Sequence, residues 1–407
     1  MEVYIARQPI LNNNGKIVAY ELLYRGKSKT MDMSDGNAAT LNVINNTFIN
    51  IGFDDVIGRG KAFVNFTGDL IKNDVPTMFN NEKIVIEILE DVKLDGELVN
   101  KVLKLKRLGF TIALDDFVLN YKNEELIPLS DIIKIDFLLT DRDERLKIAY
   151  KLKGLDVELL AEKVETYEEY IEAQKLGCTY FQGFFFEKPQ IIKARNLKSL
   201  NINHLKALEE LRKEEPDYKK LTKIIKRDFS MTFKFLKLVN SVAFYSRKRV
   251  ESLDIAIIRI GLNEISKYIF VLMLEDLTIG SPQAIVETVL IRAKFLESVS
   301  KNTKYRENND NFFLTGLFSL IDVIMNKSTK EALNEIPISM EIKNALSGEE
   351  ENIYSKMIDL VRSYERGDFD KIDELVNYFE LDLSKTNEEY FKAIKWENQI
   401  NARSNEN

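Results

Sequence analysis

The sequence predicts an α/β domain with a mostly parallel sheet in the first half of the chain and an all-α domain in the second half. Up to about Pro189, short runs of β-branched residues alternate with helical patterns, the order typical of parallel sheets. Beyond Pro189 the strand pattern ends and amphipathic helical patterns follow. The length of 407 residues fits two domains, which we place at residues 1–195 and 196–407.

Several segments of the first half have the apolar, β-branched composition of strands. They are Lys16–Tyr24, Lys61–Phe66, Lys83–Leu89, Phe110–Asp115, Asp131–Phe137, Val157–Glu162 and Thr179–Phe186. Helical patterns fill the intervals, for example at Leu98–Leu108, where Gly109 follows as a natural C-terminal cap. This regular repeat of strand and helix predicts a sheet covered by helices.

The second half is predicted to be helical throughout. Its amphipathic segments are Leu221–Ile225, Phe233–Val239, Asp254–Ile260, Ile285–Ser300 and Asn311–Met325. Residues 191–204 contain no Pro or Gly, so we expect a short helical connection between the domains. His204 lies in a polar helical pattern, and we expect its side chain at the surface.

Composition excludes several classes of function. The chain has 58 Lys and Arg against 65 Asp and Glu, a net charge of -7 that disfavours binding to a nucleic-acid polymer. The single cysteine, Cys178, excludes an intrachain disulfide and a cysteine zinc site, and the single histidine excludes mechanisms that need a histidine pair. No apolar run is long enough to span a membrane, and the N-terminus has no signal-peptide pattern. We therefore expect a cytoplasmic protein without membrane contact.

Polar residues interrupt the apolar strands at intervals of about one strand–helix unit. They are Glu21, Asn65, Glu87, Asp115 with Asp116, Lys134, Glu162 and Gln182. In a closed (β/α) barrel the strand ends converge on one mouth, where the active sites of this fold lie. Clustered carboxylates repel each other unless a cation offsets their charge, and oxygen ligands without His or Cys suit Mg²⁺, Mn²⁺ or Ca²⁺. The joint spacing therefore predicts a divalent-metal site.

Each of these residues, taken alone, also has an ordinary structural explanation. Glu87 can face solvent on the alternate side of its strand, and the Asp115-Asp116 pair can form a turn or a helix cap. Lys134 can extend its ammonium to solvent, and Gln182 can lie in a turn. Only the shared periodicity favours a site.

Residues 1–190 resemble an EAL domain, the family of cyclic-di-GMP phosphodiesterases, in seven ordered blocks. The signature Glu-x-Leu-x-Arg stands at Glu21–Arg25, and the later blocks read FVNF, IEILED, ALDDF, IKID, AEKVET and QGFFFEKP. The resemblance implies a TIM-like (β/α) barrel that hydrolyses cyclic-di-GMP to the linear dinucleotide pGpG with two Mg²⁺ or Mn²⁺ ions.

The resemblance also assigns site residues, position by position. The implied metal ligands are Glu21, Asn65, Glu87, Asp115 and Asp116. The implied catalytic residues are Lys134, Glu162, Gln182 and Glu165. The implied substrate-binding residues are Arg25, Asp136 and Pro189.

In the implied mechanism Lys134 orients and polarises the attacking water, and Glu162 acts as general base. Gln182 completes the site, and Glu165 braces the loop after the Asp pair. The guanidinium of Arg25 binds a substrate phosphate bidentately.

The chain departs from the EAL pattern at three places. The loop Asp115–Tyr121 lacks the glycines and serines that usually follow the Asp pair. Leu22 replaces the Ala of the signature, and Lys163 replaces a Gly, which adds a cation beside the site. The altered loop leaves a second interpretation open, namely a catalytically weak or inactive cyclic-di-GMP receptor or scaffold that acts through the helical domain.

Residues from about 200 to 407 resemble an HDOD domain, a helical module related to HD-type phosphohydrolases without their metal ligands. The blocks that carry the resemblance are Leu221–Asp228, Leu236–Ser241, Ser252–Gly261 and Phe312–Asp322. Ser319 and Leu320 stand where an active HD enzyme has His-Asp, so a second metallohydrolase is excluded. The EAL–HDOD order resembles a family of two-domain bacterial signalling proteins. It implies regulation, or contact with an unidentified protein partner, through the HDOD domain, and it leaves a homodimer open.

Overall fold

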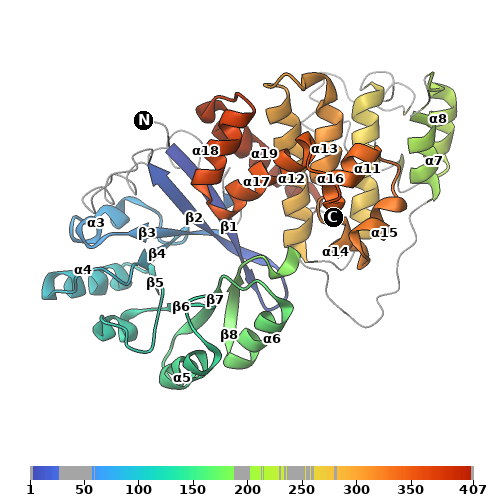
Figure 1. Ribbon diagram of the computed structural model, residues 1–407. Helices are drawn as coiled ribbons and strands as arrows, with labels where there is room; N and C mark the ends of the chain where they lie inside the picture. The colour runs from blue at the N-terminus through green and yellow to red at the C-terminus, as the bar shows by residue number, and fades with distance from the viewer. Residues whose placement is uncertain are drawn as a thin grey trace. The chain divides into compact units, whose positions relative to one another are not determined.

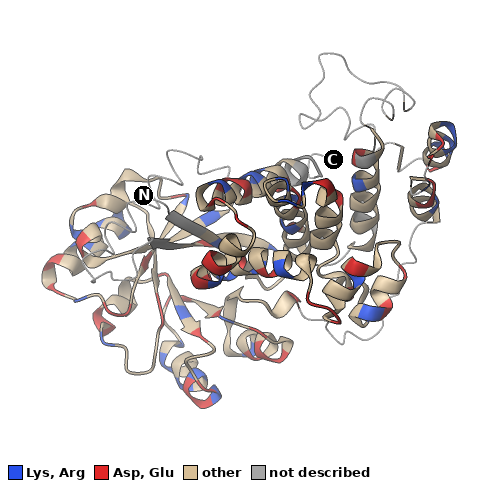
Figure 2. Cartoon of the chain, turned by 45° about the horizontal axis from the view of Figure 1, so that its top comes forward, with Lys and Arg blue, Asp and Glu red and all other residues tan. Residues whose placement is uncertain are grey.

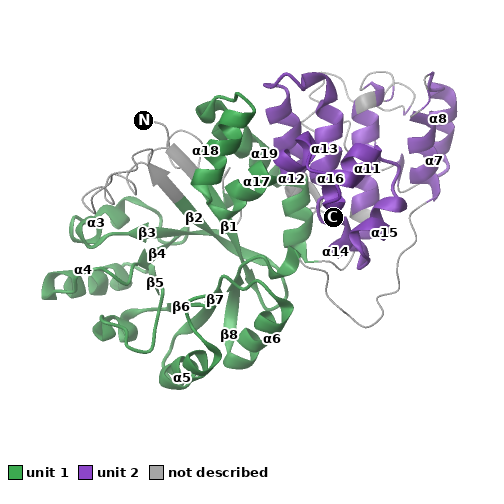
Figure 3. Cartoon of the chain, viewed as in Figure 1, with its two compact units in different colours: residues 1–188, 282–291, 359–407 green, residues 189–281, 292–358 purple. Residues whose placement is uncertain are grey.

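The computed structural model describes residues 3–26, 57–58, 60–187, 202–228 without 212 and 214, 261–278 and 282–404, with single positions between 231 and 257 (Figure 1). The chain divides into two compact units (Figure 3). The first comprises residues 1–188, 282–291 and 359–407, and the second comprises residues 189–281 and 292–358. The predicted domain boundary near residue 195 lies outside the described residues.

Eight strands of the first unit close a barrel in sequence order. They are β1 (Val3–Asn12), β2 (Ile17–Gly26), β3 (Lys61–Phe66), β4 (Ile84–Ile88), β5 (Thr111–Leu114), β6 (Ile132–Asp136), β7 (Glu158–Glu162) and β8 (Cys178–Gln182). The pairs from β2 to β8 are parallel, whereas β1 is antiparallel to both β2 and β8. The predicted barrel is confirmed, with one reversed strand.

The sequence pattern does not predict β1, because Arg7, Gln8 and Pro9 interrupt its apolar alternation. In the structure Gln8 lies opposite Glu21 of β2, and Ile10 lies opposite Gln182 of β8. The seven predicted strands are all present, Lys61–Phe66 with the predicted bounds and the others with one or both ends shifted. The last one is shorter than predicted, because β8 ends at Gln182 and a 3₁₀ turn, η5 (Phe185–Glu187), follows.

Helices and short 3₁₀ turns connect the strands of the barrel. They are α3 (Gly68–Lys72), η3 (Val75–Met78), α4 (Gly96–Arg107), η4 (Glu124–Leu129), α5 (Arg142–Leu152) and α6 (Tyr167–Leu176). The side chain of Asp95 caps α4 by accepting from the Leu98 backbone N–H at 2.9 Å. Gly109 follows α4 at a φ of +84°, which confirms the predicted C-terminal stop. The first unit also contains α18 (Phe369–Tyr378) and α19 (Leu383–Ser404).

The second unit is helical throughout the part that the structure describes, so the all-α prediction is confirmed. Its elements are α7 (Ile202–Leu211), α8 (Tyr218–Lys226), α11 (Leu262–Leu277), η7 (Arg306–Asn308), α13 (Asn309–Leu317), α14 (Ile321–Met325), α15 (Thr329–Asn334) and α16 (Met340–Ser347). The division between the units falls within α12 (Gln283–Ser300) and α17 (Ile353–Arg366). Basic and acidic residues are interspersed along the helices of both units (Figure 2), as expected for solvated faces.

The prediction of one continuous helix over Asn311–Met325 is wrong, because the structure has two helices there. The structure breaks it between α13 and α14, where the Ser319 and Ile321 N–H groups bond to residues only three positions earlier. The segments Leu221–Ile225 and Ile285–Ser300 are confirmed within α8 and α12. The segments predicted between residues 233 and 260 lie largely outside the described residues.

The single histidine and the single cysteine of the chain are both buried. His204 in α7 is only 2% exposed, so the prediction of a surface position is wrong. Its helix faces the protein interior at Ala207 and Leu208, which gives α7 a buried side that the polar sequence pattern does not reveal. Burial raises the pKa of the Cys178 thiol to about 12, so this cysteine is not a reactive group. Across the described residues, we find no helix with the length and hydropathy needed to cross a membrane.

Candidate active site

The interior of the barrel is layered, and a polar layer follows an apolar one. The apolar layer takes one residue from each of seven strands: Ile10, Ala19, Phe63, Val85, Ala113, Ile132 and Leu160. A polar residue follows two positions later on the same inward face, because strand side chains alternate with a period of two. This holds in β2, β3, β4, β6 and β7, and for the residue directly after β5. These residues are Glu21, Asn65, Glu87, Asp115, Lys134 and Glu162. The structure thus brings the predicted residues together at one end of the barrel.

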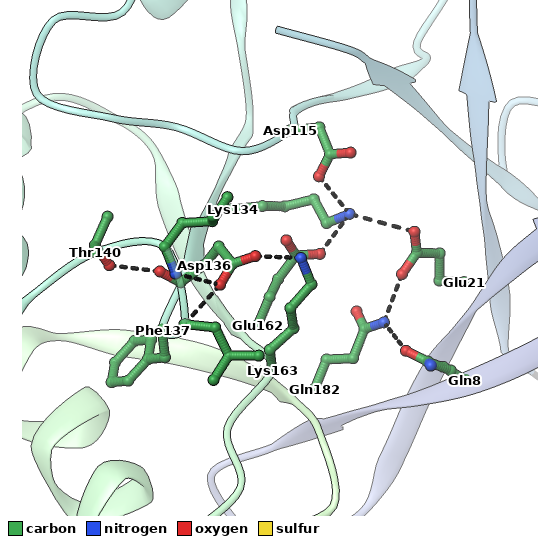
Figure 4. A network of polar contacts seen from close by, with 12 residues as sticks. Gln8, Glu21, Asp115, Lys134, Asp136, Phe137, Thr140, Glu162, Lys163 and Gln182 are labelled. Carbon is green, nitrogen blue, oxygen red and sulfur yellow. Dashed lines mark hydrogen bonds and ion pairs between the residues drawn. The ribbon is translucent and has the colours of Figure 1, made fainter. Parts of the chain in front are cut away.

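Lys134 lies at the centre of this polar layer, with a side chain that is 1% exposed. Its Nζ lies 2.7 Å from Asp115 Oδ1, 2.5 Å from Glu162 Oε1 and 3.6 Å from Glu21 Oε1 (Figure 4). The ammonium also forms an ion pair with Glu87. One ammonium cannot neutralise four carboxylates, so the site is negative when all of them are ionised.

Burial and the neighbouring charges shift the pKa values of the groups in this site. Burial raises the pKa of Glu87 well above its ordinary value, although the Lys134 ammonium opposes the shift. Burial likewise raises the pKa of Glu162 to about 8, again against the effect of Lys134. Burial disfavours the charged ammonium, yet the surrounding carboxylates, Glu162 first, hold the pKa of Lys134 well above its ordinary value. The site therefore needs protons or additional cations to balance its carboxylates.

The arrangement of the carboxylates fits divalent cations. Two groups have oxygens within 4.8 Å of one another, namely Glu21, Glu87 and Glu162, and Asp115, Asp116 and Glu162. Glu162 belongs to both groups, so its carboxylate lies beside both sets of oxygen donors. Asn65 lies beside Glu87 in the register of β3 and β4 and lines the same cavity. These donors are oxygens, the ligands that Mg²⁺ and Mn²⁺ prefer.

Gln182 holds the carboxylate of Glu21 in place from the end of β8. Its side-chain amide donates to Glu21 Oε2 and, at 2.7 Å, to Gln8 Oε1 (Figure 4). Sequence reasoning missed Gln8, because β1 runs in the opposite direction and its polar residue therefore precedes the apolar Ile10 by two positions. If β1 is recognised as a reversed strand, the two-residue spacing from Gln8 to Ile10 predicts Gln8 as a site residue.

Asp136 has a different environment from the one expected of a substrate-binding residue. It is 1% exposed, and its Oδ1 accepts from the backbone N–H groups of Leu138 at 2.6 Å and Leu139 at 3.0 Å. Its Oδ2 forms an ion pair with Lys163. Both oxygens of Asp136 are therefore engaged in shaping the turn after β6 and in positioning Lys163.

Lys163 projects into the cavity from a backbone with a φ of +53°, the left-handed region in which the resembled family usually has Gly. Glu165 also lines the cavity, at its exposed rim. Within the described part of the chain, the Glu165 carboxylate makes no hydrogen bond or ion pair, so its predicted bracing role has no contact to support it. Arg25 is the second-to-last residue of β2, its side chain lies outside the described residues, and so does Pro189.

The loop that begins at Asp115 is held by several contacts. Asp116 has a φ of +43°, and the Phe117 backbone N–H donates to the Lys134 carbonyl oxygen at 3.0 Å. The Phe117 ring stacks on Tyr121 with 4.8 Å between centroids, and both side chains are buried. Apolar packing and backbone bonds thus fix this loop, in place of the glycines of the resembled family.

A cavity of about 690 Å³ opens at the polar layer, a volume suited to a small ligand. Its lining includes Glu21, Asn65, Asp115, Asp116, Lys134, Glu162 and Gln182. The turn between α17 and α18 also lines it, through Arg366, Gly367 and Phe369. No spacing in the sequence pointed to these three residues, because they lie far along the chain from the strands.

Comparison with known proteins agrees with the two resemblances. The model of the EAL domain matches residues 62–189, and the model of the HDOD domain matches residues 197–357. The uncharacterized protein YuxH of Bacillus subtilis is 39% identical over 407 residues, which cover 97% of this chain and 98% of that protein. The chain belongs to this family of two-domain EAL–HDOD proteins.

Another EAL–HDOD relative has a named activity. CdgJ of Vibrio cholerae, a cyclic di-GMP phosphodiesterase, is 28% identical over 402 residues, which cover 98% of this chain and 93% of that protein. Among solved structures, Bacillus subtilis YkuI, with an EAL domain in complex with c-di-GMP and calcium, matches at 19% identity and a TM-score of 0.38. That match covers 64% of this chain and 71% of the other.

Proposed function

We propose that this EAL–HDOD protein is a divalent-metal-dependent phosphodiesterase that hydrolyses cyclic-di-GMP to pGpG and is regulated through its HDOD domain. The observation that carries the proposal is the convergence of Glu21, Glu87, Asp115 and Glu162 around Lys134. The named activity of CdgJ supports the choice of substrate.

The proposed ion sites follow the layered barrel. Glu21, Asn65, Glu87 and Asp115 would hold one Mg²⁺ or Mn²⁺, and Asp115 with Asp116 would hold the second. When bound, the two ions would supply Lewis-acid stabilisation of the phosphodiester oxygens and would lower the pKa of an attacking water.

The remaining steps belong to side chains of the chain itself. Lys134 would orient the water, since its ammonium is fixed between Asp115 and Glu162. Glu162 would accept the proton of that water, since its Oε1 lies in the polar layer 2.5 Å from the Lys134 ammonium that would orient the water. Gln182 would keep Glu21 aligned through its amide.

A receptor without turnover is the second candidate, and the loop after Asp115 is the observation that favours it. The loop is fixed by the buried Phe117–Tyr121 stack, so it has less freedom than a glycine-containing loop to rearrange around a substrate. Such a receptor would bind cyclic-di-GMP in the same cavity and act through the helical half of the chain.

The deciding experiment measures linear product after incubation of the purified protein with cyclic-di-GMP and Mg²⁺ or Mn²⁺. We expect product from the wild-type chain and from Asp156→Asn, an exposed aspartate outside the cavity, and none from Asp116→Asn. Binding of cyclic-di-GMP without product in the wild type would support the receptor instead. Equal product from Asp116→Asn would contradict the proposed metal site.

A further inference from the structure

The turn between α17 and α18 contributes to the wall of the cavity that holds the carboxylates. Arg366, Gly367 and Phe369 line it together with Lys134 and Glu162. These three residues belong to the same compact unit as the barrel. They also lie beyond residue 357, where the match to the HDOD domain ends, and outside the EAL match. Neither family-model match therefore covers them, and none of the sequence blocks that carry the two resemblances contains them.

Local contacts fix the shape of this turn. Gly367 has a φ of +66°, and its N–H donates to the Tyr364 carbonyl oxygen at 3.3 Å. The Asp368 carboxylate then caps α18 by accepting from the Lys371 backbone N–H at 3.1 Å. Tyr364 is anchored to α19, because its hydroxyl donates to Asn387 Oδ1 at 2.6 Å. The turn is thus held by both of its helices and by α19.

The turn also packs against the strand that carries Glu21. A Cβ atom added at Gly367 would lie 3.0 Å from Leu23 Cδ1, and Leu23 stands two positions after Glu21 in β2. Glycine adopts this positive φ without strain, and a side chain at this position would require the end of the Leu23 side chain to move. The position of Gly367 therefore fixes where Arg366 stands relative to the mouth of the barrel.

Arg366 presents its guanidinium at the cavity over an aromatic ring. Its Cζ lies 5.0 Å from the ring centroid of Phe184, which follows Gln182 by two positions. The residue is exposed, so its planar fork is accessible to a ligand. A guanidinium binds two neighbouring acceptors bidentately, whether the two oxygens of a phosphate or O6 and N7 of a guanine.

We propose that Arg366 is a substrate-binding residue, which contacts a non-reacting part of the cyclic dinucleotide through two neighbouring acceptor atoms. This inference rests on the proposed function, and it names a contact from outside the EAL segment. The site would then be incomplete in a chain that contains the barrel strands alone.

The test compares cyclic-di-GMP binding and turnover by the full-length wild type, Arg366→Ala and Arg366→Lys. We expect Arg366→Ala to raise Kd and KM about tenfold with little change in kcat, because a contact to a non-reacting group is made equally before and in the transition state. Arg366→Lys should recover only part of the loss, since an ammonium lacks the planar fork. The control is Arg107→Ala, an exposed arginine at the C-terminal end of α4 that does not line the cavity.

A substrate analogue with 7-deazaguanine bases distinguishes the two acceptor groups. If Arg366 contacts the guanine edge through O6 and N7, the wild type binds the analogue more weakly, and Arg366→Ala loses less affinity for the analogue than for cyclic-di-GMP, because the analogue keeps O6 but lacks N7. If it contacts a phosphate, Arg366→Ala weakens the binding of both ligands by the same factor. Either result supports the proposal. If the wild type binds cyclic-di-GMP and Arg366→Ala binds it equally well, the role of Arg366 is contradicted but the proposed function is not. If the wild type does not bind cyclic-di-GMP, the proposed function is contradicted as well.

Discussion

Lys134 is the counter-ion of the buried carboxylates, and its removal should cost stability before any effect on catalysis is considered. The substitution Lys134→Met keeps an unbranched side chain of similar length, but it removes the ammonium that Glu87, Asp115 and Glu162 share. Breaking a buried charge pair from one side costs about 3–5 kcal/mol. We expect thermal unfolding in the presence of a chelator to show a loss of this order.

The matched control for this prediction is Lys106→Met. Lys106 pairs with Asp131, but the two side chains are 30% and 36% exposed, so the loss should stay below about 1 kcal/mol. Added Mn²⁺ should stabilise Lys134→Met more than it stabilises the wild type, because the ion replaces the missing positive charge. Similar melting of the Lys134 and Lys106 variants would show that Lys134 is not the counter-ion.

Gly183 allows β8 to pass closely by the segment after β7. Its φ is +141°, and an added Cβ would lie 2.2 Å from the Val164 carbonyl oxygen. We expect Gly183→Ala to reduce the free energy of unfolding by more than about 3 kcal/mol in a urea titration. Gly96→Ala is the control, because nothing lies within 4 Å of its added Cβ, and it should change stability by less than about 1 kcal/mol. Comparable midpoints for the two variants would contradict the close approach.

At the scale of elements, the sequence predicts site residues where consecutive strands are parallel and carry their polar residue at the same spacing. Asn65 and Glu87 were predictable, because each follows a buried strand residue by two positions and each strand is parallel to its neighbour. Strand β1 was not predictable in the same way, since its direction is reversed and Pro9 interrupts its pattern. The sequence therefore did not predict Gln8 as a site residue, although the side chains of β1 alternate between the two faces of the sheet as in the other strands.

Helix α12 carries a buried carboxylate whose ionisation should make the helical unit sensitive to acid. Glu297 is 3% exposed, which by itself disfavours its charge, but Lys294 and Lys267 outweigh burial and lower its pKa to about 2. The Nζ atoms of Lys267 and Lys294 lie 2.5 Å and 2.8 Å from its oxygens. A carboxylate with a lowered pKa stabilises the fold above its unfolded-state pKa, and this contribution is lost as the pH falls toward 2.

The expected size of this effect is roughly 2–3 kcal/mol between about pH 4.5 and pH 2. Glu297→Gln should be less stable than the wild type at pH 7, and the difference should shrink across that interval. Chemical denaturation of both chains at a series of pH values measures it. A constant difference from pH 7 to pH 2 would mean that the Glu297 charge does not contribute.

At the scale of the whole molecule, the cavity depends on residues that the strand pattern cannot reveal. The convergence of the carboxylates follows from a closed barrel, so a sequence that predicts the barrel also predicts Asp115 and Glu162 at its mouth. The position of Arg366 follows instead from the packing of α17, α18 and α19. Such packing depends on side-chain shape over long separations along the chain, which local periodicity does not encode.

The same packing predicts that residues 1–195 do not fold as an independent barrel, although they contain every implied metal ligand. The first compact unit also includes residues 282–291 and 359–407. The buried Tyr20 hydroxyl donates to Glu287 Oε2 at 2.7 Å, a bond that the truncated chain cannot form. We expect residues 1–195 to give little soluble protein, with no cooperative thermal transition. A truncated chain that melts cooperatively at the temperature of the full-length protein would contradict this.

A point substitution isolates one contact of this interface without removing the segments. Tyr20→Phe leaves the buried Glu287 without a hydroxyl partner, which should cost about 1–3 kcal/mol in the free energy of unfolding. The control is Tyr180→Phe, because the Tyr180 hydroxyl donates to Glu158 at 3.0 Å in an exposed pair and its loss should cost less than about 1 kcal/mol. If Tyr20→Phe lowers the free energy of unfolding no more than Tyr180→Phe does, the hydrogen bond from β2 to α12 does not stabilise the barrel. That result would also weaken the argument that the barrel needs residues 282–291 and 359–407 to fold.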